Sequence, residues 1–457
     1  MRESLVIFLE RDILPIYDSF DSAHDIKHAR SVTADSLAAA RETGADEEMC
    51  LAAAAYHDIG LRLRREDHNI TSANIMRSDK RLEKWFTGEQ IRIMADAVED
   101  HRASAAEPPR TLYGRILADA DREYTVERVL ERTVLFGRSN YRDLSPKEQI
   151  DRAYRHINEK YGENGYLSFC TQREEYKNTA RQITALLADR ERFEAMCLKY
   201  LALPDTRMET ARYLKRIGFT GQASPYAGTL RSLQVCHLRS VPYENMDILN
   251  GKPLSLERRD LYRKIVLEGR GGFCFELNEL FGWLLRVIGF HVVDCFGRFL
   301  AGEASVPMRR HHVLIVTVPG TGERYLCDVG VGSGSPTEPL PLICNRVFDQ
   351  GDNVWDIVRD SYLGYVVRLY KHGSWQNVYS FTEEPQLPED FLAACFYCEH
   401  SPASPFNKAP MISLRNERGR TTLDGDELRF FEGDTVKTEK ISDITEALKK
   451  HFGINLR

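Results

Sequence analysis

The chain has 457 residues, of which 42% are hydrophobic and 28% are charged, and its formal net charge is -6. This length is enough for at least two ordinary domains, and the composition is that of a globular rather than a disordered protein. The net charge gives no overall attraction to nucleic acid or to an anionic membrane surface, so we expect neither as a partner.

The beginning of the sequence lacks the pattern of a secretory signal. Residues 5–9 are apolar, but Glu3 precedes them and Glu10 and Arg11 follow directly. No apolar run approaches the ~20 residues that a membrane-spanning helix needs. Ten cysteines without dense, regular spacing indicate reduced thiols. We therefore expect a cytoplasmic protein.

Residues 1–200 are predicted to be almost entirely helical. The stretches 35–41, 47–56 and 180–187 are rich in strong helix formers, and strand-like alternation is scarce. Histidines and aspartates recur within these helices. Imidazole and carboxylate together suit a borderline or hard divalent cation that keeps water ligands.

The order of these residues, a histidine, then a His-Asp pair, then an aspartate, resembles the HD-domain metal-dependent phosphohydrolases. The resemblance implies that His28, His57, Asp58 and a later aspartate hold a divalent metal ion of unknown identity. Such an ion lowers the pKa of a bound water and produces hydroxide near neutral pH.

Two aspartates compete to be that later ligand. Asp121 lies four residues after Leu117 and borders the apolar face of its helix. Asp119 groups instead with Arg115 and Arg122 and is predicted to be their solvated partner. Asp121 is therefore the predicted ligand.

Two further histidines complete the predicted N-terminal site. His68 and His101 are expected either to contact a substrate phosphate or to complete a second metal site. The expected substrate is a small phosphorylated molecule or a nucleotide. A related domain can also bind a nucleotide without cleaving it.

Residues 201–207 interrupt the helical pattern and are the predicted linker to a second domain, residues 208–457. This domain is expected to stay largely helical to about residue 290. After that, short stretches rich in Val, Ile and aromatics, separated by Gly and Pro, indicate strands. A helical opening, a strand-rich middle and a mixed tail predict an α+β domain.

Residues 270–278, RGGFCFELN, combine a glycine turn with the start of a helix. Gly271 and Gly272 permit a tight turn, and apolar residues at helical spacing predict a helix to about Gly289. Near a helix start, unpaired N–H groups and the helix dipole favour a thiolate. We therefore predict that Cys274 is a nucleophile rather than a buried structural cysteine.

A free thiol has a pKa of ~8.5, so Cys274 needs a base, and a carboxylate would orient that base. The strand beginning at His312 and the strand ending at Asp328 supply both. His311 is the competing base. His311 and His312 lie on opposite faces of their strand, but both faces are apolar, so periodicity does not choose between them.

Four ordered motifs make residues from about 208 onward resemble an arylamine N-acetyltransferase. They are HLRSVPYENMD (237–247), RGGFCFELN (270–278), HVLIV (312–316) and DVGVG (328–332). The stretches YSFT (379–382) and SPASPF (401–406) extend the similarity. The resemblance implies a helical bundle, a β-barrel and an α/β lid.

In the family pattern, a histidine stands immediately before the apolar residues of this strand, which favours His312. The implied triad is therefore Cys274, His312 and Asp328. The implied reaction is ping-pong: Cys274 takes an acetyl group from acetyl-CoA and passes it to a small-molecule, arylamine-type amine. Gly330 and Gly332 are expected to let the CoA pyrophosphate approach the backbone.

The predicted architecture is therefore multidomain, with an all-α HD domain followed by an α+β acetyltransferase domain that carries a cysteine-protease-like triad. Two other functions stay open. The triad can serve an amide synthase that uses another acyl donor. The HD domain can be a metal- or nucleotide-binding module that regulates the transferase.

Overall fold

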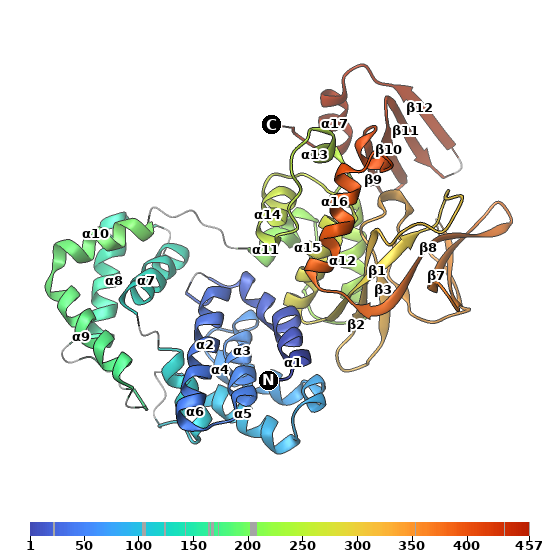
Figure 1. Ribbon diagram of the computed structural model, residues 1–457. Coiled ribbons are helices and arrows are strands. Elements are labelled where there is room, and N and C mark those ends of the chain that lie inside the picture. Colours follow the sequence, from blue (N-terminus) through green and yellow to red (C-terminus); the bar gives the residue numbers. More distant parts are fainter. Residues whose placement is uncertain are drawn as a thin grey trace. The chain divides into compact units, whose positions relative to one another are not determined.

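The computed structural model describes the chain except residues 22, 103–106, 123–124, 142, 163–164, 166–168, 172, 202–207, 352, 434 and 457, and the side chain of residue 333. The chain divides into two compact units, Met1–Met208 and Glu209–Arg457. Figure 1 shows them in blue to green and in yellow-green to red. The predicted linker lies outside the described residues except for Leu201, which ends a helix.

The first core of the N-terminal unit surrounds an alanine-rich helix, α3 (Glu47–Tyr56), which is buried from Met49 onward. Its small side chains let α2, α5 and α6 pack closely around it. The elements of this core are α1 (Glu3–Phe8), η1 (Leu9–Ile13), η2 (Leu14–Ser19), α2 (Ile26–Thr43), α3, η3 (Ile59–Arg62), α4 (His68–Ser78), η4 (Lys80–Lys84), α5 (Gly88–Asp100) and α6 (Leu112–Ala120).

A second helical cluster follows in the same unit. It consists of α7 (Val126–Asn140), α8 (Pro146–Tyr161), α9 (Glu174–Ala188) and α10 (Arg190–Leu201). These amphipathic helices bury their apolar faces against one another around Val134, Ile157 and Phe193. The described part of the unit is thus helical throughout, as predicted (Figure 1).

The C-terminal unit opens with a helical bundle around α15 (Cys274–Ile288). All of α15 is buried, which identifies it as the central helix. Tyr213 stacks on Trp283, and His237 packs on Phe281. The surrounding elements are α11 (Thr210–Arg216), α12 (Ala227–Ser240), α13 (Met246–Leu249), α14 (Arg258–Tyr262) and η5 (Arg263–Leu267).

An antiparallel sheet in the order β4-β3-β2-β1-β8-β7-β6-β5 follows the bundle. Leu326 on β3 and Trp355 on β6 share one core although their strands lie far apart in the sheet order, so the sheet curls into a barrel. Its elements are β1 (His291–Phe299), β2 (His311–Thr317), β3 (Arg324–Cys327), η6 (Gly332–Gly334), β4 (Leu340–Pro341), β5 (Val347–Asp349), β6 (Val354–Asp360), β7 (Gly364–Lys371) and β8 (Ser374–Pro385).

The tail forms a second, smaller sheet in the order β12-β11-β10-β9, packed against α17 through Leu428 and Leu448. In chain order, the tail consists of η7 (Pro388–Phe391), α16 (Leu392–His400), η8 (Pro405–Asn407), β9 (Met411–Arg415), β10 (Gly419–Asp424), β11 (Glu427–Glu432), β12 (Thr435–Lys440) and α17 (Ile444–Phe452). The predicted fold class, an all-α part followed by an α+β part with bundle, barrel and lid, is confirmed.

Candidate active sites

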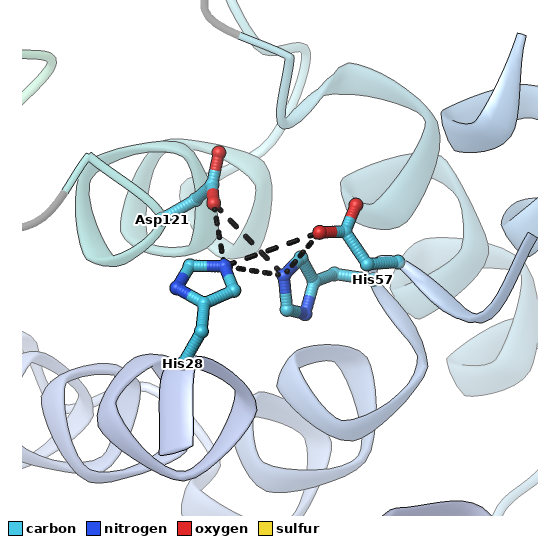
Figure 2. Close-up of side chains that lie close together, drawn as sticks. His28, His57 and Asp121 are labelled. Atoms are coloured by element: carbon cyan, nitrogen blue, oxygen red, sulfur yellow. Dashed lines mark hydrogen bonds and ion pairs between the residues drawn. The ribbon is translucent and has the colours of Figure 1, made fainter. Parts of the chain in front are cut away.

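The predicted metal ligands of the N-terminal unit come from three helices. His28 lies in the first turn of α2, where the N-cap Asp25 accepts a hydrogen bond from the His28 backbone N–H. His57 and Asp58 follow the buried end of α3, and Asp121 follows α6. Figure 2 shows His28, His57 and Asp121 directed into one small space.

Four side chains converge in that space. His28 Nε2 lies 3.1 Å from Asp121 Oδ1 and 3.2 Å from His57 Nε2. Asp58 Oδ2 lies 3.3 Å from His57 Nε2. The four candidate ligand atoms lie within 4.8 Å of one another, so the structure brings the predicted set together.

Asp58 also faces a second pair of histidines. Its Oδ1 atom lies 3.2 Å from His68 Nε2 and 3.5 Å from His101 Nε2. Gly60 permits this approach, because a Cβ there would lie 2.3 Å from the His68 carbonyl oxygen. A carboxylate with one oxygen toward each pair of histidines suits two adjacent metal ions that share Asp58.

Hydrogen bonds behind the histidines orient them for a cation. In His57, His68 and His101, Nδ1 lies 2.6–2.8 Å from the carbonyl oxygen three residues earlier. A carbonyl oxygen only accepts, so each Nδ1 carries the proton and each Nε2 presents a lone pair. Sequence reasoning did not assign these partners.

The carboxylates of the site also point to a cation. Asp58 Oδ1 and Asp121 Oδ1 are buried without a well-directed hydrogen bond and face imidazole nitrogens. Burial acts to raise the pKa of both carboxyls. The neighbouring histidines, joined at Asp121 by Arg132, outweigh it and hold each pKa well below its usual range. This buried nitrogen and oxygen set fits a borderline or hard divalent ion.

Asp119 is not the solvated residue that the helix pattern predicts. It is fully buried, and its carboxylate accepts hydrogen bonds from Arg122 Nη1 at 3.0 Å and from the backbone N–H groups of Cys170 and Thr171 at 2.7 and 2.6 Å. Its role is to hold a later segment of the chain against α6.

In the C-terminal unit, Cys274 is the first residue of α15, as predicted. Gly271 is required before it, because a Cβ there would lie 1.9 Å from the Pro242 carbonyl oxygen. Glu276 then accepts a hydrogen bond from the Phe273 backbone N–H at 3.1 Å and so caps the first turn.

A buried ion-pair network supports this turn. Lys264 Nζ lies 2.6 Å from Glu276 and 2.8 Å from Asp247, and Arg270 lies 3.0 Å from Asp247 and 2.7 Å from Glu244. Four of these five side chains come from the motifs 237–247 and 270–278. Much of the similarity in those motifs thus positions Cys274 rather than touching a substrate.

The two adjacent histidines of β2 pair with different carboxylates. His311 Nε2 lies 2.8 Å from Asp328 Oδ2, and its ring meets the edge of Tyr379. His312 Nε2 lies 3.0 Å from Asp294 Oδ1. The expected His312–Asp328 pair is therefore wrong, because strand alternation turns His312 to the face opposite Asp328.

The His312 side chain makes a different set of buried contacts. Its ring stacks on Phe391 with centroids 4.2 Å apart, and its partner Asp294 also pairs with Arg286. These contacts hold the His312 ring against Phe391 and Asp294 rather than Asp328.

Asp328 is oriented by several donors. Besides His311, its carboxylate accepts hydrogen bonds from Asn278 Nδ2 at 3.0 Å and from the Gly330 backbone N–H at 2.8 Å. Asn278 also donates to the His312 carbonyl oxygen at 2.7 Å. Asn278 thereby ties α15 to β2 and to the residues after β3.

The Cys274 thiol lies at the backbone beside His311. Its Sγ atom is 3.8 Å from Arg310 O, and the backbone N–H of His312 also faces it. Cys274 is 4% exposed, and burial raises the pKa of its thiol well above the usual value, although the His312 N–H acts in the opposite direction. The helix start alone therefore does not produce a thiolate, and a proton acceptor is needed.

Gly330 and Gly332 allow close approach of the chain after β3. A Cβ at Gly330 would lie 2.6 Å from Cys274 Cα, and one at Gly332, where φ is +56°, would lie 2.2 Å from Ser413 Oγ. Their role in this structure is packing beside Cys274, and contact of either glycine with CoA stays a prediction.

Comparison with known proteins decides the family. A family model described as N-acetyltransferase matches residues 227–457. The arylamine N-acetyltransferase of Mycolicibacterium smegmatis is 34% identical over 259 residues, covering 54% of this chain and 93% of that protein. This chain belongs to the arylamine N-acetyltransferase family. The corresponding enzyme of Escherichia coli K12 is 28% identical over 53% of this chain and 88% of its own length.

Solved structures of the N-acetyltransferase family agree with this assignment. The M. smegmatis enzyme matches with a TM-score of 0.52 and 32% identity over 55% of this chain and 93% of that one. The Mycobacterium marinum enzyme, solved in complex with CoA, matches with a TM-score of 0.52 and 30% identity over 54% and 93%. A separate family model, described as HD domain, matches residues 25–125.

In this N-acetyltransferase, Asn278 is a site residue to which the sequence prediction assigned no role. Its position held a usable signal: Cys274 and Asn278 are four residues apart and share one face of α15. A polar residue on the cysteine's face of an otherwise apolar helix indicates a partner in the site. Within the described residues, no helix combines the length and apolarity needed to cross a bilayer.

Proposed function

We propose that the C-terminal unit transfers an acetyl group from acetyl-CoA to an arylamine through a Cys274 thioester, with His311 as the base. The observation that carries this proposal is the buried His311–Asp328 hydrogen bond beside the cysteine at the start of α15. Further support comes from relatives named arylamine N-acetyltransferase, one of them solved with CoA.

In the first half-reaction, the Cys274 sulfur attacks the thioester carbon while its proton passes to His311. His311 Nε2 is hydrogen-bonded to the Asp328 carboxylate, so the other ring nitrogen, Nδ1, is the one that takes that proton. The carbon–sulfur bond to CoA then breaks, and the proton goes to the departing CoA sulfur. Backbone N–H groups at the start of α15 stabilise the transient oxyanion.

In the second half-reaction, the amine nitrogen attacks the carbonyl carbon of acetyl-Cys274. The carbon–sulfur bond to Cys274 breaks, and the proton lost by the amine returns through His311 to the cysteine sulfur. The products are the N-acetylated amine and the free thiol.

Intact-mass measurement tests this proposal. Incubation with acetyl-CoA should add one acetyl group to the chain, and a small arylamine should remove it. Cys274→Ala should stay folded and gain no acetyl group. A native chain that stays unmodified by acetyl-CoA but is acylated by another thioester would indicate an amide synthase instead.

We also propose that the N-terminal unit is a metal-dependent phosphohydrolase. His28, His57, Asp58 and Asp121 would hold one divalent ion, and Asp58, His68 and His101 a second. When bound, such ions supply Lewis acidity and lower the pKa of a coordinated water. Water oxygen bonds to phosphorus, the bond from phosphorus to the leaving oxygen breaks, and that oxygen takes a proton.

Metal analysis and a phosphoester panel test the second proposal together. The native chain should retain divalent metal after gel filtration and release phosphate in a chelator-sensitive way, whereas Asp58→Asn should lose both. If chelation instead impairs acetyl transfer and no phosphate is released, the unit regulates the transferase.

A further inference from the structure

A cavity of about 390 Å³ opens beside Asp121 and is walled largely by α7 and α8. We call it the α7–α8 pocket. These helices lie beyond the residues that the HD family model matches, so this wall comes from the second helical cluster. The cavity adjoins the candidate metal centre, because Asp121 belongs to both.

The lining of the pocket is strongly basic. Four basic side chains line it, Arg65, Arg132, Arg152 and Lys160, and among the described lining residues the only acidic side chain is Asp121. Arg132 lies closest to the metal centre, with Nη1 3.1 Å from the Asp121 carbonyl oxygen and 3.6 Å from Asp121 Oδ1. The other end of the pocket, formed by α8, has no acidic lining residue among those described.

Aromatic rings hold the guanidinium groups in place. Arg65 and Arg152 lie 4.8 and 5.8 Å from the centroid of the Phe136 ring, and Arg152 also lies 5.5 Å from that of Tyr141. Phe136 and Tyr141 thus serve as platforms for cations. This arrangement favours recognition of negative charge over stacking of an aromatic base.

The α8 end of the pocket is positively charged, with Arg152 and Lys160 in its lining. Arg152 Nε is buried without a hydrogen-bond partner, and burial lowers the pKa of this guanidinium. His156 also lines the pocket, and its pKa is lowered first by loss of solvent and then by Lys160 and Arg152. A bound anion would offset this positive field by pairing with the Arg152 guanidinium and the Lys160 ammonium.

We infer that the α7–α8 pocket binds a second phosphoryl group of the substrate, so that the N-terminal unit acts on small molecules that carry at least two phosphoryl groups. One group lies at the metal centre beside Asp121, and the other lies between Arg152 and Lys160 on α8. The cavity has the volume of roughly 13 liquid waters, which is more than a single phosphate needs. This inference rests on the proposed phosphohydrolase function.

Binding of non-hydrolysable probes to the metal-loaded full chain tests the inference. Calorimetric titration should show that methylenediphosphonate binds at least about 10-fold more tightly than methylphosphonate, since its second phosphonate gains charged hydrogen bonds in the pocket. Lys160→Gln and Arg152→Gln should each reduce that preference about 10-fold or abolish it. Lys160→Gln is the more informative variant if Arg152→Gln, which also removes packing against Tyr141, folds poorly.

Arg155→Gln is the matched control. Arg155 is exposed on the same helix, three residues from Arg152, and does not line the pocket. This variant makes the same charge change and should leave the preference intact. Equal affinity for the two probes, or an equal loss in Arg155→Gln, would overturn the inference.

The two proposals for the N-terminal unit fail in different ways. If the diphosphonate preference depends on Arg152 and Lys160 but no phosphoester is cleaved, the pocket is correct and the hydrolase activity is not. If simple monophosphates are cleaved and the preference is absent, the hydrolase stands and the pocket assignment falls.

Discussion

The two histidines at the start of β2 meet different carboxylates. His311 Nε2 bonds Asp328 on the Cys274 side, and His312 Nε2 bonds Asp294 on the other. Both rings are buried and both meet a carboxylate, so neither feature alone distinguishes them. The position of the carboxylate does: Asp328 lies two residues before Gly330, which packs against Cys274, whereas Asp294 pairs with Arg286.

Replacing each histidine with glutamine separates their roles. His311→Gln should slow formation of acetyl-Cys274 by about 10²–10⁴-fold, because it removes the proton acceptor. His312→Gln, the adjacent control, should lower thermal stability while keeping most of the acetylation rate. Single-turnover mixing with acetyl-CoA measures both, and the opposite result would make His312 the base.

The pH dependence of cysteine alkylation gives a second test at this residue. In His311→Gln the thiol keeps a pKa raised by burial, so its thiolate, and the rate of reaction with iodoacetamide, should increase only at alkaline pH. The native chain should already react at pH 7, because transfer of the proton to His311 supplies a thiolate. Equal rates at pH 7 would argue against that transfer.

At the scale of elements, the start of α15 depends on buried ion pairs that sequence motifs supply. Lys264 lies between Glu276 and Asp247, and all three are largely buried. Burial raises the pKa of Glu276, while Lys264 opposes that shift. Removing the lysine would therefore leave the buried Glu276 carboxylate without its cation, whereas Asp247 keeps Arg270.

Lys264→Met should destabilise the C-terminal unit by about 3–5 kcal/mol, the usual cost of breaking a buried ion pair from one side. Denaturant unfolding followed by tryptophan fluorescence measures the loss. Adding Glu276→Gln should recover part of it, since the second change removes one uncompensated charge. A double variant no more stable than the single one would mean that packing of the lysine stem dominates.

At the scale of the whole molecule, the chain contains two units with separate hydrophobic cores. The candidate metal ligands belong to the first unit, and Cys274, His311 and Asp328 belong to the second. We propose that residues 1–200 and 208–457 fold independently and that residues 201–207 link them.

Chelation should therefore affect one unit only. Calorimetry of the full chain should show two transitions, and removal of metal should lower the one belonging to the N-terminal unit. Metal at about 100 times its Kd contributes about 2.7 kcal/mol to folding. Asp58→Asn, which weakens the candidate site, should not respond to chelator. A single transition that shifts as a whole would mean that the units unfold together.

Local sequence patterns are sufficient to predict much of this protein. Helix-forming composition predicts the N-terminal helices, and the change from helical to strand-like period predicts a helical opening, a strand-rich middle and a mixed tail. The resemblance to the arylamine N-acetyltransferases adds the order bundle, barrel and lid. The resemblance to HD domains implies that His28, His57-Asp58 and a later aspartate meet, and the helix pattern selects Asp121 as that aspartate. Helix and strand patterns can be predicted in this way because residues close together in the sequence determine the local backbone conformation.

Where two nearby residues are of the same type, which of them belongs to the site depends on partners that lie far away in the sequence. His311 rather than His312 faces Asp328, and Asp119 is buried, because segments that are distant in sequence supply their partners. The α7–α8 pocket likewise forms only where α8 meets the residues beside Asp121. Periodicity assigns a residue to a face of its own element, but it carries no information on which element packs against that face.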